Sequence, residues 1–154
     1  MSDQAQPTPS SEPAKAIYLA DYKAPGYTTE RTELHFEIRD GKTTVTSTLH
    51  VRRQDESANL LELMGEELVL VSVAVDGRML SSNEYEQSAR TLTIFGLQGQ
   101  NQIQIVTEIC PEENTALEGL YRSSNMYCTQ CEAEGFRKIT YYQDRPDVLA
   151  KFRT

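Results

Sequence analysis

The stretch Thr32–Val51, TELHFEIRDGKTTVTSTLHV, decides the fold class of this chain. Apolar and polar residues alternate along both of its halves, and a period of two places alternate side chains on one face of a sheet. The apolar members are Leu34, Phe36 and Ile38 before the turn, and Val45, Leu49 and Val51 after it. Between the halves stands an Asp-Gly pair, which is typical of a tight hairpin turn. The stretch therefore predicts a β-hairpin with one buried face.

The same pattern continues through four further stretches, residues 58–67, 67–80, 83–97 and 101–114. Each is a short apolar or alternating run, and turn residues separate them. The first breaks at Gly65, the second contains another Asp-Gly turn, and the last stops near Pro111. Seven to nine short strands at this spacing indicate an all-β fold, an antiparallel sandwich or a curved sheet.

The two ends of the chain have a different character. Residues 1–15 are rich in Pro, Ser, Gln and Ala, and we expect a disordered tail there. Residues 17–27 read as an irregular arm whose tyrosines, Tyr18, Tyr22 and Tyr27, pack against the fold. Residues 115–143 have weak periodicity and predict mostly loop. Residues 144–152 predict one short helix, with Asp144 as N-cap and Pro146 in the first turn.

Composition narrows the class of protein. The chain has 154 residues, which suits one domain, and 23 acidic against 15 basic side chains give a net charge of -8. Nucleic-acid binding needs a basic surface, so we expect no nucleic-acid partner. No apolar run reaches the length of a membrane span, and the first 15 residues do not resemble a signal peptide. Three cysteines, an odd number, favour the cytoplasm over an oxidising compartment.

The cysteines raise the question of a metal or redox site. Cys128 and Cys131 form a CxxC pair, Cys110 lies 18 residues upstream, and the histidines, His35 and His50, fall within strand patterns. A structural zinc site needs four ligands, and a thioredoxin-like pair belongs at the start of a helix in a βαβ unit. We therefore predict that the sulfurs pack a loop. A small zinc or redox module remains the weaker alternative.

Motifs of catalysis are missing from the chain. It contains no His-Glu-x-x-His segment, no nucleophile elbow and no glycine-rich loop that opens a helix. We predict no catalytic residue and no metal ligand in this chain.

An acidic segment offers a different kind of site. Between Glu108 and Glu134 there are six glutamates and one basic residue, Arg122. Gln130 and Glu132 are two residues apart, so in an extended segment their side chains point the same way. An amide oxygen and a carboxylate accept hydrogen bonds from one ammonium group. This pair is a candidate amine-binding site, although solvated surface side chains are the simpler interpretation.

Three stretches carry a family resemblance: YKAPGY (Tyr22–Tyr27), NTALEGLYRS (Asn114–Ser123) and CTQCEAEGFRKITYYQDRPDVLAKF (Cys128–Phe152). Together they closely resemble the start of the bacterial aminopeptidase N family, zinc alanyl aminopeptidases, in its proteobacterial branch. The resemblance covers the chain after the tail. It implies that residues 16–154 are the N-terminal domain, an antiparallel saddle-shaped β-sandwich that covers a thermolysin-like catalytic domain. It also implies that this domain is truncated at its C-terminal end.

The resemblance also assigns roles to residues. In the family, a loop of the N-terminal domain supplies a Gln-x-Glu pattern to the substrate pocket, and the matching positions are Gln130 and Glu132. The glutamate binds the free α-amino group of the peptide, and the glutamine lines the first side-chain pocket. Zinc belongs to the catalytic domain, and the family does not use the CxxC pair as a metal site.

The sequence thus predicts a domain that caps a zinc aminopeptidase, binds the substrate amine and is inactive by itself. Its expected partners are peptides with a free N-terminus and the catalytic domain of the same polypeptide, with neither nucleic acid nor membrane. Open strand edges predict self-association of the isolated chain. A stand-alone β-sandwich binding module is the alternative from another functional class.

Overall fold

A computed structural model describes residues 18–154 of the chain, so the tail predicted for residues 1–15 lies outside the described residues. The Thr32–Val51 stretch forms the expected hairpin. Strand β1 (Tyr27–Arg39) pairs with β2 (Lys42–Arg53) in antiparallel register, with Arg39 opposite Lys42.

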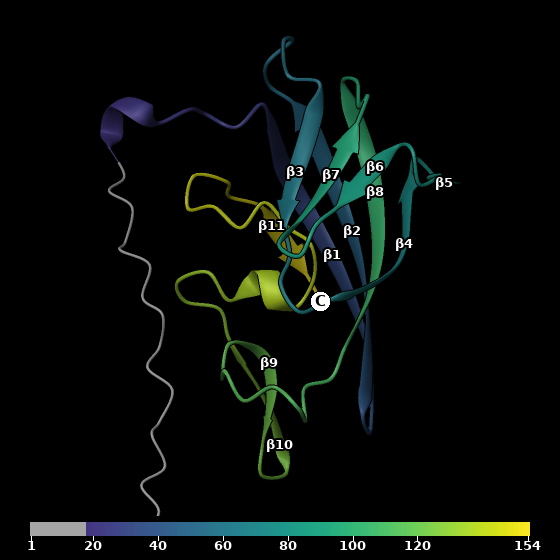
Figure 1. Cartoon of the computed structure of the whole chain (residues 1–154), viewed down its shortest axis with the longest axis vertical. Helices are drawn as coiled ribbons and strands as arrows, with labels where there is room; N and C mark the ends of the chain where they lie inside the picture. The colour runs from purple at the N-terminus through teal and green to yellow at the C-terminus, as the bar shows by residue number, and fades with distance from the viewer. Residues whose placement is uncertain (1–17) are drawn as a thin grey trace, which may run out of the picture.

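Nine further strands and two short 3-10 helices complete the structure (Figure 1). Up to Ile109 these elements are η1 (Leu19–Asp21), β3 (Leu60–Met64), β4 (Val69–Val75), β5 (Arg78–Met79), β6 (Tyr85–Gln87), β7 (Thr91–Phe95) and β8 (Gln100–Ile109). After it come β9 (Gly119–Ser123), β10 (Met126–Gln130), η2 (Phe136–Lys138) and β11 (Lys151–Arg153).

The strands form three sheets. Six strands make the largest sheet, in the order β11-β1-β2-β8-β4-β5, and three make a second sheet in the order β3-β7-β6. The β9–β10 hairpin stands apart as a two-stranded sheet, below the other two in Figure 1. All pairs are antiparallel except β1 with β11. The prediction of an all-β, sandwich-like fold is confirmed.

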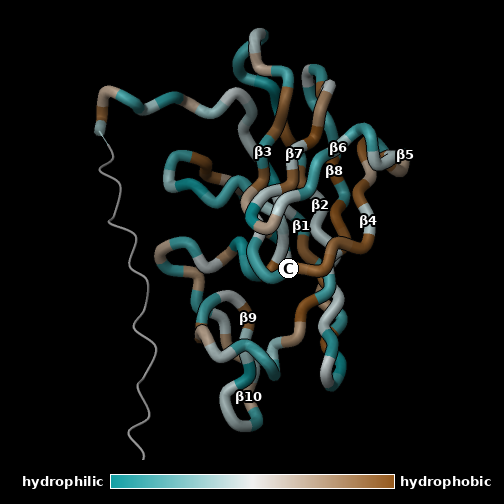
Figure 2. The backbone as a smooth tube through the Cα atoms, viewed as in Figure 1, coloured by the Kyte–Doolittle hydropathy of each residue, from teal (hydrophilic) through white to brown (hydrophobic). Residues whose placement is uncertain are grey.

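The main hydrophobic core lies between the six-stranded and three-stranded sheets. It draws fully buried residues from both, including Leu49 and Ile105 from the larger sheet and Leu63 and Ile94 from the smaller one. Hydrophobic residues gather along β3, β7 and β4 in Figure 2. On β2 the buried residues alternate with threonines of the outer face, as the period-two pattern requires.

A second, smaller core cluster lies under the β9–β10 hairpin. Its buried members are Val45 of β2, Leu120 of β9 and Ile139, which follows η2. Partly buried Phe36 and Tyr127 pack against it. This cluster fixes the hairpin on one end of the large sheet.

The prediction of mostly loop over residues 115–143 is wrong for its first half. Residues 119–130 form the β9–β10 hairpin, with Met126 opposite Ser123 and Gln130 opposite Gly119. The two-residue turn at Ser124–Asn125, with Ser124 at a φ of 56°, joins them. The segment alternates poorly because much of the hairpin is solvent-exposed, so no apolar stripe marks it.

The short helix predicted over residues 144–152 does not form. The segment makes one hydrogen-bonded turn, from the Val148 amide to the Arg145 carbonyl at 3.2 Å, and then enters β11. Strand β11 pairs in parallel with β1, with Arg31 opposite Lys151. Asp144 caps no helix. Pairing with a strand more than a hundred residues away overrides the local helix signals.

The sequence predicts that three tyrosines of the arm, residues 17–27, pack against the fold, and the structure confirms this only in part. Tyr27 is buried, and its hydroxyl donates to the Leu97 carbonyl at 3.0 Å. Tyr22 is exposed, although its hydroxyl donates to Asp147 at 3.0 Å. Tyr18 is exposed as well, so the predicted packing is wrong for this side chain.

Candidate functional site

Gln130 and Glu132 lie at the point where β10 ends. Gln130 is the last residue of the strand, and a turn from Cys131 to Gly135 leads into η2. The Gly135 amide donates to the Cys131 carbonyl at 3.0 Å and closes this turn. The Glu132–Ala133 peptide bond within it is cis.

The two candidate residues meet within this turn. The Gln130 side-chain oxygen Oε1 accepts a hydrogen bond from the Glu132 backbone amide at 3.1 Å. Both residues are exposed. Within residues 18–154, no hydrogen bond or ion pair engages the Glu132 carboxylate. The carboxylate is therefore available to a cation from outside the chain.

Three nearby glutamates, unlike Glu132, have internal partners. Glu112 accepts from the Tyr127 hydroxyl at 2.6 Å, and this bond lowers the pKa of the Glu112 carboxyl below its ordinary value. Glu118 lies 3.7 Å from the Lys138 ammonium, and Glu134 lies 3.3 Å from the Arg137 guanidinium. Of the six glutamates in the acidic segment, Glu113 and Glu132 are thus the two whose carboxylates have no partner within residues 18–154, and of these two Glu132 lies on the closed turn beside Gln130.

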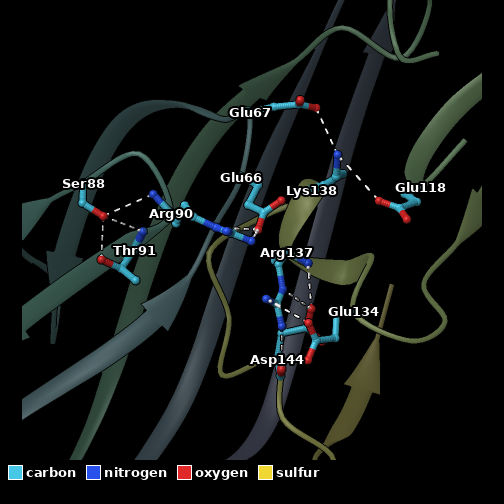
Figure 3. A network of polar contacts seen from close by, with 10 residues as sticks. All are labelled: Glu66, Glu67, Ser88, Arg90, Thr91, Glu118, Glu134, Arg137, Lys138 and Asp144. Atoms are coloured by element: carbon cyan, nitrogen blue, oxygen red, sulfur yellow. Dashed lines mark hydrogen bonds and ion pairs between the residues drawn. The ribbon is translucent and has the colours of Figure 1, made fainter. Parts of the chain in front are cut away.

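Arg137 anchors the far end of the turn (Figure 3). Its Nε and its backbone amide both donate to Asp144 Oδ2, at 3.0 and 3.2 Å, and Nη2 donates to the Asp144 carbonyl at 3.1 Å. Both side chains are largely buried, at 13% and 15% exposure. The Arg137 carbonyl accepts from the Glu66 amide at 2.9 Å, which ties η2 to the end of β3. These bonds hold η2 on the sandwich.

Arg122 anchors the hairpin at its other end. Its guanidinium lies 3.7 Å from Asp40 in the β1–β2 turn and 3.9 Å from Glu112. It also lies over the Tyr127 ring, 5.8 Å from the centroid. Side chains of the hairpin thereby contact both the large sheet and the chain that leads into β9.

The cysteines do not gather into a site. Cys131 packs against the second core cluster, and burial raises the pKa of its thiol. Cys128 is half-buried opposite Tyr121 in the hairpin, and Cys110 lies near Glu112. No group of three or more His, Cys, Asp or Glu side chains within residues 18–154 is arranged to hold a metal ion.

The histidines lie on the outer face of the large sheet. His50 contacts Arg31 at 3.0 Å and Glu33 at 3.5 Å, and His35 lies 3.9 Å from Glu37. These are cross-strand and same-strand surface contacts, so neither histidine joins the Gln130–Glu132 turn.

The comparisons with known proteins decide the family. Residues 27–154 match the Peptidase M1 N-terminal domain. This chain belongs to that family. Aminopeptidase N of Caulobacter vibrioides is 46% identical over 138 residues, which are 90% of this chain and 16% of the relative. The resemblance to proteobacterial aminopeptidase N is confirmed. The M1 domain described above spans about a sixth of that relative's length.

Solved structures agree with the M1 assignment. Aminopeptidase A of Legionella pneumophila, solved with aspartic acid, superposes with a TM-score of 0.81 at 31% identity, over 87% of this chain and 16% of that one. An M1 zinc metallopeptidase mutant of Deinococcus radiodurans, bound to a Tyr-Ser-Ala substrate, superposes with a TM-score of 0.68 at 16% identity. The match covers 82% of this chain and 31% of that one. At that identity it supports the fold alone.

The M1 chain contains features that the sequence did not reveal. The Arg137–Asp144 contact and the Arg122 contacts were not predicted, since nothing in a local pattern marks ion pairs between distant elements. Gly119 and Gly135 also gave no signal, because their importance lies in close backbone contacts. Neither helix in the described part of the chain has the length or apolar character to cross a membrane.

Proposed function

We propose that residues 16–154 act as the N-terminal domain of an aminopeptidase, where Glu132 binds the α-amino group of the peptide substrate and Gln130 lies beside it. The observation that supports this most directly is the exposed Glu132 carboxylate on a closed turn beside Gln130, with no partner within residues 18–154, in a segment where four of the six glutamates are paired. Homology to M1 zinc aminopeptidases supplies the reaction class.

The chemistry of the amine suits this site. An α-amino group with a pKa of about 7.7–8.0 is largely protonated at neutral pH and donates up to three hydrogen bonds. A carboxylate acceptor gives a charge-assisted bond. Fixing the amine places the first peptide carbonyl at a constant distance from the anchor, which is a positioning contribution to catalysis. It also restricts cleavage to the chain end.

Zinc chemistry is assigned to a different part of the enzyme. No described residues of this chain fit a metal ion. In M1 enzymes zinc supplies an activated water molecule for hydrolysis. Our proposal gives this chain only substrate binding and contact with a catalytic domain.

A chimera tests the amine anchor. Residues 18–154 replace the matching segment of Caulobacter vibrioides aminopeptidase N, and kcat/KM is measured on a dipeptide with a free N-terminus. We expect Glu132→Gln to lower kcat/KM about 100-fold, the loss of one charged hydrogen bond in a desolvated site. Glu113→Gln is the matched control, because Glu113 is also exposed and its carboxylate has no partner within the described residues. An unchanged kcat/KM for Glu132→Gln refutes the proposal.

We also propose that the isolated chain self-associates through the open edge of β1. Strand β1 has 13 residues, yet β11 pairs only with Arg31–Glu33. From Leu34 to Arg39 no described strand pairs with that edge, so its backbone groups are available to another strand. Sedimentation velocity at several concentrations tests this: a concentration-dependent dimer is expected, and a monomer at every concentration contradicts it.

We propose a cytoplasmic location on the basis of cysteine usage. All three cysteines are free thiols in the folded chain. Free thiols are typical of a reducing compartment. Cell fractionation with an antibody against the chain tests this, and recovery from the periplasmic fraction contradicts it.

A further inference from the structure

The turn that carries Glu132 rests directly on a glycine backbone. A Cβ atom at Gly135 would lie 2.5 Å from the Gln130 carbonyl oxygen, 3.1 Å from the Cys131 Cα and 3.2 Å from the Gly119 nitrogen. All three atoms belong to the backbone, which yields less readily than the end of a flexible side chain. Gln130 and Cys131, the two residues before Glu132, are therefore packed closely against Gly135.

Close backbone atoms, and not the backbone conformation, are what require glycine at position 135. Its φ is -81° and its ψ is -15°, a right-handed conformation that any residue adopts without strain. The backbone conformation therefore does not oppose Gly135→Ala, and the smaller conformational freedom of alanine in the unfolded chain favours the folded state. The close contact with Gln130 and Cys131 remains as the main constraint.

Gly119 supports the same contact from the other side. It stands opposite Gln130 in the β9–β10 pair, at a φ of 72°. A Cβ there would lie 2.8 Å from the Lys138 Cβ and 3.2 Å from the Gly135 carbonyl oxygen. The start of β9, the end of β10 and the start of η2 thus meet backbone to backbone at two glycines.

We propose that Gly135 is a positioning residue for the amine anchor: the absence of its side chain sets the position of the Gln130–Cys131 backbone and, through it, of the Glu132 carboxylate. This inference rests on the proposed function. A Cβ at position 135 moves the turn by roughly half an ångström or more, since a contact of 2.5 Å cannot persist. Misplacement on this scale is enough to weaken a positioned contact substantially.

The chimera described above tests the inference with two inhibitors, a substrate-like dipeptide analogue and the same compound without its α-amino group. The ratio of their inhibition constants measures the advantage that the amine confers. We expect Gly135→Ala to lower this advantage about 10-fold and to leave binding of the des-amino compound within twofold. Because Gly135 acts through Glu132, the double variant with Glu132→Gln is expected to lose no more than Glu132→Gln alone.

Gly26→Ala is the matched control. A Cβ at Gly26 would also meet its nearest atom at 2.5 Å, here the Ala58 Cβ, and no left-handed φ constrains the position. Gly26 and the β9–β10 hairpin lie at opposite ends of the 13-residue strand β1. Gly26 precedes the strand, and Asp40, which Arg122 of the hairpin contacts, follows it. Gly26→Ala is expected to lower stability and to leave the amine advantage unchanged.

The outcomes separate the two proposals. If Glu132→Gln leaves the amine advantage intact, the proposed function fails and the inference fails with it. If Glu132→Gln removes the advantage but Gly135→Ala does not, or if their effects add, the inference alone is wrong. Should Gly135→Ala not fold, Gly119→Ala takes its place: its Cβ would lie 3.2 Å from the Gly135 carbonyl oxygen and 2.8 Å from the Lys138 Cβ, and the strain of its left-handed φ is read from stability, separately from the amine advantage. A non-additive loss supports the inference and an unchanged advantage overturns it.

Discussion

Replacing Asp144 by asparagine distinguishes two roles for this residue. The sequence pattern makes it the N-cap of a helix, and asparagine caps a helix about as well as aspartate. The structure makes it the partner of Arg137, whose Nε and backbone amide both donate to the Asp144 carboxylate. In that role the negative charge matters, and asparagine supplies none.

The magnitude follows from burial. The two side chains are 13% and 15% exposed, so solvent screens their interaction little. Hydrogen bonds to charged groups contribute about 1.5–3 kcal/mol, and asparagine keeps an oxygen that accepts from Arg137. We expect Asp144→Asn to lower the free energy of unfolding by about 2 kcal/mol. For a domain of this size that is roughly 4–8 °C in Tm.

The assay is urea unfolding of the 154-residue chain, followed by far-UV circular dichroism because the chain has no tryptophan. Asp40→Asn is the control: this carboxylate is 97% exposed, so its ion pair with Arg122 is expected to contribute less than about 1 kcal/mol. Arg137→Gln completes a double-mutant cycle, in which a coupling energy of at least about 1 kcal/mol is expected. Unchanged stability of Asp144→Asn, or zero coupling, refutes the reasoning.

Two further predictions concern titrating groups. A bidentate bond from Arg78 lowers the pKa of Glu84 from 4.5 to about 2, so the stability it contributes is complete above the ordinary value and is lost as pH falls toward 2. The difference in unfolding free energy between wild type and Glu84→Gln is therefore constant above about pH 5.5 and falls to a small fraction of that value near pH 2; a difference as large at pH 2 as at pH 7 contradicts the prediction. Burial raises the pKa of the Cys131 thiol. Native Cys131 should react with iodoacetamide at pH 8 about 10-fold more slowly than glutathione, measured by peptide mass spectrometry. Equal rates contradict it.

Family resemblance, rather than local pattern, was what selected the candidate site. Spacing alone left Gln130 and Glu132 as an ordinary pair in an acidic run, and it drew attention to Cys128 and Cys131 instead. The structure adds the closed turn, the bond from the Glu132 amide to Gln130 and the absence of an internal partner for the Glu132 carboxylate within the described residues.

The sequence by itself determined the strands from Thr32 to Ile109, because period-two alternation and Asp-Gly turns are local signals that each hairpin carries within a few residues. Only the tertiary structure decided the segment after Asn114. There Lys151–Arg153 pairs with β1, and Asp144 pairs with Arg137 instead of starting a helix. Such contacts join residues that are far apart in the sequence. The hydrogen bonds and burial gained in them outweigh the weak local propensities, and a sequence pattern records only those propensities.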